Sequence, residues 1–149
     1  MILISHKGNL SGRDRDNENH PDQVLKVLKM GFHCEIDVWR VDDEFYLGHD
    51  EPQHLIDAKF LRNSGLWVHA KNLDVLNNIP FSKTKDGSFL SNDVRFFWHQ
   101  ADDFTLTSNG LIWTFPNKEV CEKSIIVDND KNWRDKEYTC YGVCTDWIL

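Results

Sequence analysis

Eight short apolar runs recur along the chain at similar spacing, and turn-forming residues bound each of them. The runs cover residues 2–5, 33–39, 44–48, 66–70, 94–99, 111–115, 124–128 and 141–145. Short runs of this kind, rich in apolar and aromatic residues, are typical of β-strands. The spacing therefore predicts a chain built on eight strands.

Helix signals are concentrated in the first half of the chain. Between the first two strands, Pro21 stands at a helical first turn, apolar residues follow at helical spacing, and Gly31 marks the end. Further helices are expected over residues 52–63 and 73–78. Residues 12–20, 83–91, 102–110 and 117–123 have loop character. The helices thus become scarcer toward the C-terminus.

This order of elements predicts an α/β fold, a compact (β/α)8 TIM-type barrel with reduced helices in its C-terminal half. The 149 residues fit one domain, residues 1–149, although barrels of this type commonly need ~250 residues. An open α/β sheet is the alternative. Loops or a partner subunit would cover the outward face of the late strands, so we expect a monomer or a homodimer.

Charge and hydropathy exclude some classes of function. The formal net charge of -7 argues against a general nucleic-acid binder, because phosphate backbones require a basic surface. No apolar run approaches 18 residues, and the start of the chain does not have the pattern of a signal peptide, so we expect a cytoplasmic protein without a membrane span. The four cysteines form no CxxC pair and are expected to be free thiols.

Two carboxylates are expected to point in the same direction from one strand. In the run at residues 33–39, the strand period of two places Glu35 and Asp37 on one face, with Cys34, Ile36 and Val38 on the other. Burying two negative charges together is costly without a compensating cation, and Mg²⁺ and Ca²⁺ prefer oxygen ligands. The pair predicts a metal site holding Mg²⁺ or Ca²⁺, with a structural ion pair or a solvated edge strand as the alternative.

Two histidines stand at strand ends. His6 follows Ile2 and Ile4 on one face of the first strand, and His49 follows Phe45 and Leu47 on one face of the third. Imidazoles titrate near neutral pH, so two of them facing one site can serve as a general base and a general acid. We predict that His6 and His49 are a catalytic acid/base pair.

Together, these residues resemble a known family. The ordered set His6-Lys7-Gly8, Glu18-Asn19, Glu35-Ile36-Asp37-Val38 and Leu47-Gly48-His49-Asp50 is similar to the glycerophosphodiester phosphodiesterase family, and more widely to phosphatidylinositol-specific phospholipase C and spider-toxin-type phospholipase D enzymes. The segments at residues 67–71 and 142–147 are weaker likenesses. The resemblance implies a TIM barrel, a histidine pair at His6 and His49, and a divalent metal on Glu35 and Asp37. It also implies that Lys71 contacts the phosphate.

The chain departs from the family pattern at three positions. Lys7 replaces an arginine, His20 replaces a threonine, and His69 stands where the family has a third carboxylate. Lys7 can still contact a phosphate as a point charge. His69 is expected to be the third metal ligand, and imidazole suits Zn²⁺, Fe, Ni or Cu better than Ca²⁺.

Two further residues are candidates for substrate contact. His99 and Trp113 fall near the ends of their strands, where they would reach a substrate unless they pack in the core or at its edge. The resulting expectation is metal-dependent hydrolysis of a glycerophosphodiester or a related small phosphodiester in lipid metabolism. The alternatives are a catalytically degenerate protein that binds a phosphorylated ligand, a structural protein, and a different metal-dependent hydrolase that uses His69 and His99 as ligands.

Overall fold

The computed structural model describes residues 1–79, 87 and 94–149. In this part of the chain there are two α-helices, α1 (Pro21–Lys29) and α2 (Leu73–Asn78), and two short 3-10 helices, η1 (Ala58–Arg62) and η3 (Trp133–Asp135). The strands are β1 (Ile2–His6), β2 (His33–Val41), β3 (Glu44–Leu47), β4 (His54–Ile56), β5 (Leu66–Ala70), β6 (Arg95–Phe97), β7 (Phe104–Leu106), β8 (Ile112–Thr114), β9 (Ser124–Val127) and β10 (Gly142–Thr145). All eight predicted strands are confirmed, with small shifts at their ends.

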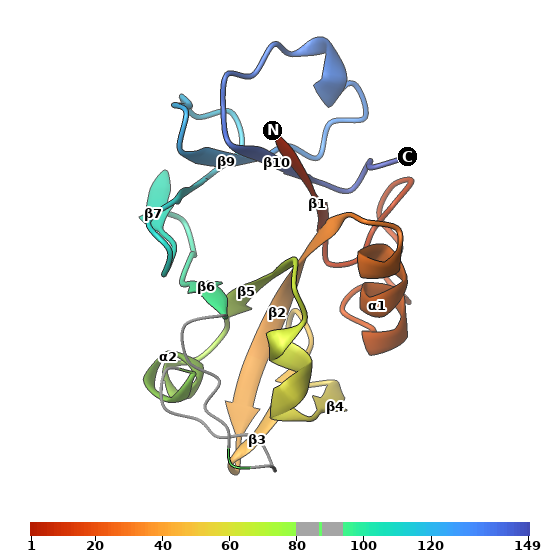
Figure 1. The fold of residues 1–149 in the computed structure, drawn as a ribbon, viewed down its shortest axis with the longest axis vertical. Coiled ribbons are helices and arrows are strands. Elements are labelled where there is room, and N and C mark those ends of the chain that lie inside the picture. Colours follow the sequence, from red (N-terminus) through yellow and green to blue (C-terminus); the bar gives the residue numbers. More distant parts are fainter. Residues whose placement is uncertain (80–86, 88–93) are drawn as a thin grey trace.

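The strands form one curled mixed sheet (Figure 1). Its parallel part runs in the order β6-β5-β2-β1-β10-β9-β8, so the first and last parts of the chain meet where β1 pairs with β10. β3, β4 and β7 add antiparallel pairs at the edges. The carboxyl ends of β5, β2, β1 and β10 therefore lie at one rim of the sheet.

The predicted (β/α)8 TIM barrel is wrong. β2 and β3 form a hairpin, because only Asp42 and Asp43 separate them and both adopt positive φ, 48° and 67°. A parallel connection needs a crossover of about a dozen residues or more, so β3 cannot enter the parallel run. The described residues contain two α-helices, far fewer than a (β/α)8 barrel requires.

Two local expectations also need correction. The helix expected over residues 52–63 is instead strand β4 followed by η1, because His54–Ile56 pairs with β3 and the Asp57 side chain caps η1 at Lys59 N, 2.8 Å away. The loop expected over residues 102–110 contains β7, which pairs with β8. The helices at α1 and α2 are confirmed. Apart from Gly87, the loop expected over residues 83–91 lies outside the described residues.

The two faces of the sheet carry different apolar clusters. One face packs against α1, η1 and α2 and contains Cys34, Ile36 and Val38. The opposite cluster draws one buried residue from each of six strands: Ile4, Trp67, Phe97, Trp113, Ile125 and Cys144. Because side chains alternate along a strand, Glu35 and Asp37 lie on the face opposite Cys34, Ile36 and Val38, as predicted.

Loop residues cover the outer side of the late strands. A third cluster joins Ile126 of β9 and Val143 of β10 to Trp133 of η3, with Tyr138 and Trp147 packed against it. Asp128 fastens this loop by accepting hydrogen bonds from Lys136 Nζ at 2.7 Å and Tyr138 Oη at 2.6 Å. No helix among the described residues is long and apolar enough to cross a membrane.

Candidate metal and acid/base site

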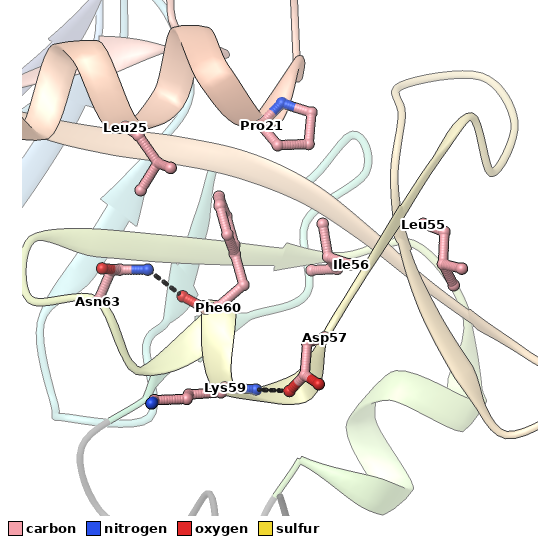
Figure 2. Close-up of a pocket in the computed structure, with 8 residues that line it drawn as sticks. All are labelled: Pro21, Leu25, Leu55, Ile56, Asp57, Lys59, Phe60 and Asn63. Atoms are coloured by element: carbon pink, nitrogen blue, oxygen red, sulfur yellow. Dashed lines mark hydrogen bonds between the residues drawn. The ribbon is translucent and has the colours of Figure 1, made fainter. Parts of the chain in front are cut away.

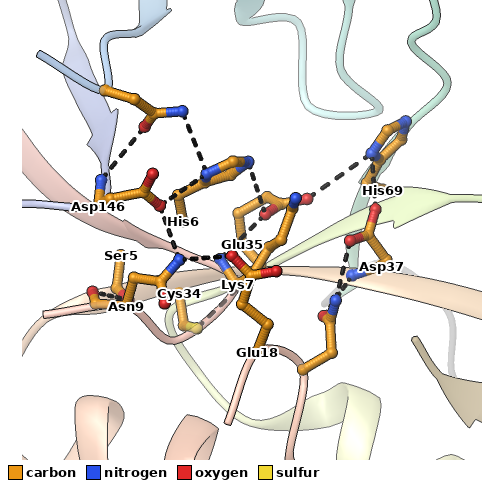
Figure 3. Close-up of polar contacts among 12 residues, drawn as sticks. Ser5, His6, Lys7, Asn9, Glu18, Cys34, Glu35, Asp37, His69 and Asp146 are labelled. Carbon is orange, nitrogen blue, oxygen red and sulfur yellow. Dashed lines mark hydrogen bonds and ion pairs between the residues drawn. The ribbon is translucent and has the colours of Figure 1, made fainter. Parts of the chain in front are cut away.

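Five polar side chains converge at the carboxyl rim of the parallel strands (Figure 3). The register places His6 of β1 beside Glu35 of β2, and Asp37 of β2 beside His69 of β5. Asp146 follows directly after β10, the other neighbour of β1. Adjacent parallel strands thus bring together residues that are as much as 140 positions apart in sequence.

Three of these residues form a potential metal-binding group. Glu35, Asp37 and His69 each offer one ligand atom, and these atoms lie within 4.8 Å of one another. His69 Nδ1 is 3.0 Å from Asp37 Oδ1 and 3.7 Å from Glu35 Oε1. Both carboxylates are buried, with relative exposures of 2% for Glu35 and 0% for Asp37. The predicted metal ligands are therefore brought together.

Asp37 is held on both sides of its carboxylate. Asn19 Nδ2 donates to Asp37 Oδ2 at 2.9 Å, and the backbone N–H of Asp37 donates to Asn19 Oδ1 at 2.9 Å. Asp37 Oδ1 forms no well-oriented hydrogen bond, but Lys71 Nζ lies 3.4 Å away. Burial alone would raise the pKa of Asp37, but His69, Lys71 and Asn19 together hold it well below its usual range, so the group is a carboxylate at neutral pH.

The orientation of His69 is fixed by a backbone carbonyl. Its Nε2 lies 2.7 Å from the carbonyl oxygen of His99, and its ring stacks on Phe97 with the ring centroids 5.1 Å apart. A carbonyl oxygen only accepts, so Nε2 carries a proton and Nδ1 faces the two carboxylates. Burial disfavours the charged ring, but the hydrogen bonds and charges of Asp37 and Glu35 raise the pKa of His69 to about 9.

His6 forms a dyad with a carboxylate that the motif analysis did not assign. His6 Nδ1 lies 2.9 Å from Asp146 Oδ1, and His6 Nε2 lies 4.0 Å from Glu35 Oε2. Burial alone would raise the pKa of Asp146, but His6, Asn9 and Lys7 lower it, so Asp146 is ionised and accepts the proton of His6 Nδ1. The unprotonated Nε2 then faces the metal-binding group and can act as a base.

The loop after β1 braces both halves of the site. Asn9 Nδ2 donates to Asp146 Oδ1 at 2.7 Å and to Glu18 Oε1 at 3.0 Å, and Arg13 Nε donates to the same Glu18 oxygen at 2.9 Å. Asn19 adopts a left-handed backbone with φ 59°, a conformation that asparagine tolerates better than most residues. Residues 7–19 thus connect the His6–Asp146 dyad to Asp37.

His49, the second predicted catalytic histidine, lies at the edge of this arrangement. Its side chain is 41% exposed, and its Nδ1 lies 2.6 Å from Asp50 Oδ1. It lines a small polar cavity of about 130 Å³ together with Glu18 and Asn19. The structure therefore places His49 beside the loop that contacts Asp37, and the described contacts do not join it to His6.

The predicted substrate contacts divide into two groups. Lys71 lies at the site, and Lys7 is buried beside it, donating its backbone N–H to Glu35 Oε2 at 3.2 Å. Trp113 is 3% exposed and stacks on Phe97 in the apolar cluster, which corresponds to the alternative of core packing. The ring nitrogens of His99 are buried and form no hydrogen bond. His99 reaches the site through its backbone carbonyl oxygen, which contacts His69 Nε2.

A larger pocket lies elsewhere on the molecule. It has a volume of about 540 Å³ and is mainly apolar, with α1, β4 and η1 supplying its walls through residues such as Leu25, Ile56 and Phe60 (Figure 2). None of the predicted site residues is among the described residues that line it. Its volume therefore does not point to the candidate site, which is identified by the titratable groups at the strand rim.

Comparisons with protein-family models, with curated proteins and with solved structures found no match for this chain. The assignment of a function therefore depends on the geometry of the site and on the motifs described above.

Proposed function

We propose that this protein is a metal-dependent phosphodiesterase. The observation that carries the proposal is the position of the His6–Asp146 dyad at the same rim as Glu35, Asp37 and His69, with His6 Nε2 4.0 Å from Glu35. A base beside a group of potential metal ligands is an arrangement typical of metal-assisted hydrolysis. The resemblance of the first third of the chain to the glycerophosphodiester phosphodiesterase family supports the same reaction.

The donor set fits a divalent cation. Glu35 and Asp37 are buried carboxylates, Asp37 Oδ1 is buried without a well-formed hydrogen bond, and His69 directs Nδ1 toward both. A cation held there would supply positive charge to a non-bridging phosphate oxygen and stabilise charge that develops in the transition state.

The remaining steps belong to the side chains. His6 Nε2 takes the proton of the attacking hydroxyl or water, and Asp146 stabilises the imidazolium that results. Lys71, 3.4 Å from Asp37, adds positive charge on the side of the site where the phosphate would bind. His49, in the small polar cavity beside Asn19, protonates the leaving alcohol as the substrate spans the two sites.

The substrate that we propose is a glycerophosphodiester or a related small diester. The small cavity at His49 is polar and about 130 Å³ in volume, which suits a short hydrophilic alcohol better than an acyl chain. A role in lipid metabolism follows from this substrate class, and a cytoplasmic location is a further part of the proposal.

One observation favours a second candidate, a protein that binds a phosphorylated ligand without turnover. His69 and Lys71 already place positive charge beside Asp37, so the two carboxylates can be neutralised without a metal. His49 is also partly exposed and paired with Asp50, and the described contacts do not join it to His6. Such a protein would bind phosphate esters at this rim and hydrolyse none of them.

A panel assay separates the two candidates. Purified protein is incubated with glycerophosphodiesters that differ in head group, with added divalent cations or with a chelator, and alcohol release is measured. The proposal predicts turnover that the chelator abolishes and that His6→Ala lowers by about 10²-fold or more. His54→Ala is the matched control: His54 lies in β4, its ring contacts His20 and not the dyad, and its variant should retain full turnover.

A further inference from the structure

We infer that the metal site selects a Zn²⁺-type transition ion over Mg²⁺ and Ca²⁺, through nitrogen ligation by His69. The inference deepens the proposed function, because it names the ion of the same site. It departs from the expectation of Mg²⁺ or Ca²⁺ that the two carboxylates alone suggest.

The first support is the orientation of the His69 ring, which turns Nδ1 toward the two carboxylates. The His99 carbonyl, 2.7 Å from His69 Nε2, leaves Nδ1 as the ring atom that faces Asp37 and Glu35. Metal-binding histidines commonly donate their second N–H to a carbonyl or carboxylate, which fixes the ring for ligation. Stacking on Phe97 restrains the ring further. Imidazole is a good ligand for Zn²⁺ and a poor one for Mg²⁺ and Ca²⁺.

The second support is an unsatisfied buried oxygen. Asp37 is 0% exposed, and its Oδ1 lacks a well-formed hydrogen bond, whereas Oδ2 is bound by Asn19. Oδ1 is also the atom nearest to His69 Nδ1, at 3.0 Å. Its neighbours, His69 Nδ1 and Lys71 Nζ at 3.4 Å, are ion-pair contacts and not well-oriented hydrogen bonds, so this buried oxygen can still serve as a metal ligand.

The number and spacing of donors agree with this class of ion. Within the described part of the chain, the group comprises three donors, two oxygens and one nitrogen, and the donor atoms lie within 4.8 Å of one another. Ligands ~2.0–2.2 Å from one Zn²⁺ lie at most ~4 Å apart, so the donors need to move inward only slightly. Catalytic zinc sites commonly have three protein ligands and an open position, whereas Ca²⁺ takes six to eight oxygens.

The competing account is a metal-free ion-pair cluster. In that account His69 and Lys71 remain charged and compensate Glu35 and Asp37, and no ion is bound. This account predicts that the purified protein binds neither Zn²⁺ nor Mg²⁺ at this site, so direct binding measurements decide between the two.

Metal binding is measured on the full chain, without reference to turnover. Metal-free protein is titrated calorimetrically with Zn²⁺, Mn²⁺, Mg²⁺ and Ca²⁺ in turn, and ligation is followed by long-range ¹H–¹⁵N NMR of the histidine rings. We expect one Zn²⁺ per chain, bound at least about 10²-fold more tightly than Mg²⁺ or Ca²⁺. Zn²⁺ should move the Nδ1 resonance of His69 and leave His54 unchanged.

Three variants assign the selectivity to the imidazole. His69→Glu restores an all-oxygen donor set, and it should lower the preference for Zn²⁺ over Mg²⁺ by about 10-fold or more while circular dichroism shows an unchanged fold. His99→Ala keeps the backbone carbonyl that orients His69, and it should retain the wild-type preference. His54→Ala is the matched control for loss of a histidine.

The outcomes are distinguishable. Tighter binding of Mg²⁺ or Ca²⁺ than of Zn²⁺ by the wild type overturns the inference and leaves the proposed phosphodiesterase function in place. Zn²⁺ binding that His99→Ala abolishes and His69→Glu leaves unchanged also overturns it. Absence of binding by every ion refutes both the inference and a metal-dependent reaction.

Discussion

Asp146 is the residue on which the chemistry of His6 depends most directly. It accepts the proton of His6 Nδ1 at 2.9 Å, and Asn9 Nδ2 donates to the same oxygen at 2.7 Å. Because Asp146 is charged and partly shielded from water, it both selects the tautomer of His6 and stabilises the imidazolium. We regard Asp146 as a positioning residue.

Replacing Asp146 by Asn should therefore impair turnover while leaving the fold intact. The amide removes the negative charge, and its NH₂ group can oppose the donors of His6 and Asn9. We expect kcat to fall by roughly 10–100-fold with a small change in KM.

Asp103→Asn is the matched control for this prediction. Asp103 is a half-exposed carboxylate whose ion-pair partner is Lys118, at 2.9 Å, and not a residue of the candidate site. Its variant should retain the wild-type kcat and KM. If Asp146→Asn had the same kcat as Asp103→Asn, the dyad would have no role in the reaction.

The residue scale also shows why only part of the site was predictable. Strand alternation alone placed Glu35 and Asp37 on one face, and the structure agrees. Asp146 was not assigned, and Asn19 entered only as part of the Glu18-Asn19 motif without a role. Each acts from a loop, where no periodicity predicts the direction of a side chain. The signal for Asp146 was its position directly after a buried strand, the same signal that selected His6 and His49.

At the scale of elements, the turn between β3 and β4 determines where His49 lies. Gly48 has φ 154°, its carbonyl accepts from Trp39 Nε1 at 2.7 Å, and a Cβ at this position would lie 2.0 Å from the backbone oxygen of Glu51. The turn has no room for a side chain. The position of the catalytic candidate therefore depends on this glycine.

Gly48→Ala should destabilise the protein and displace His49. The added methyl group forces the turn to move. We expect a loss of about 3 kcal/mol in the free energy of unfolding, which is at the upper end of the range for local backbone strain.

Gly110→Ala is the control, since Gly110 also has positive φ, at 81°, but an added Cβ meets nothing within 4 Å. It should cost about 1–2 kcal/mol. Urea unfolding of both variants checks the difference, and equal losses would contradict the steric account.

The loop between β9 and β10 depends on a carboxylate. Burial alone would raise the pKa of Asp128, but hydrogen bonds from Lys136 and Tyr138 lower it. Burial and the hydrogen bond to Asp128 raise the pKa of Tyr138 to about 12. A depressed pKa stabilises the fold fully above the unfolded-state value of ~3.9, and this contribution is lost as the pH falls through the folded value.

Asp128→Asn should therefore destabilise the protein at neutral pH and much less in acid. At pH 7 we expect a loss of about 1–3 kcal/mol in the free energy of unfolding, because charge-assisted bonds to a buried acceptor are lost. As the pH falls through the folded-state pKa of Asp128, the wild-type carboxyl also becomes protonated and the difference should shrink. Urea unfolding at a series of decreasing pH values tests this, and a constant difference would show that the charge of Asp128 is unimportant.

At the scale of the whole molecule, strand positions followed from the sequence and strand pairing did not. The apolar runs are local signals, so even the bounds of β5 were predicted. Pairing depends on connections, and the turn at Asp42 and Asp43 makes β3 antiparallel to β2, which removes one strand from the expected barrel. The connections after β6, all within described residues, contain no α-helix, yet the parallel order that assembles the site persists.

The central claim is that the buried group Glu35, Asp37 and His69 works with His6 in hydrolysing a phosphodiester. The most direct test follows conversion of a glycerophosphodiester by ³¹P NMR, with metal content measured on the same samples, for the wild type and for Asp37→Asn. Asp37 is the choice because its Oδ1 is buried without a well-oriented hydrogen bond, and because Asn19 can still pair with the amide oxygen of the variant. We predict that the wild type binds the metal and is active. We predict that the variant folds but has lost both the metal and the activity. Equal conversion by the two proteins, or conversion without metal, would contradict the account.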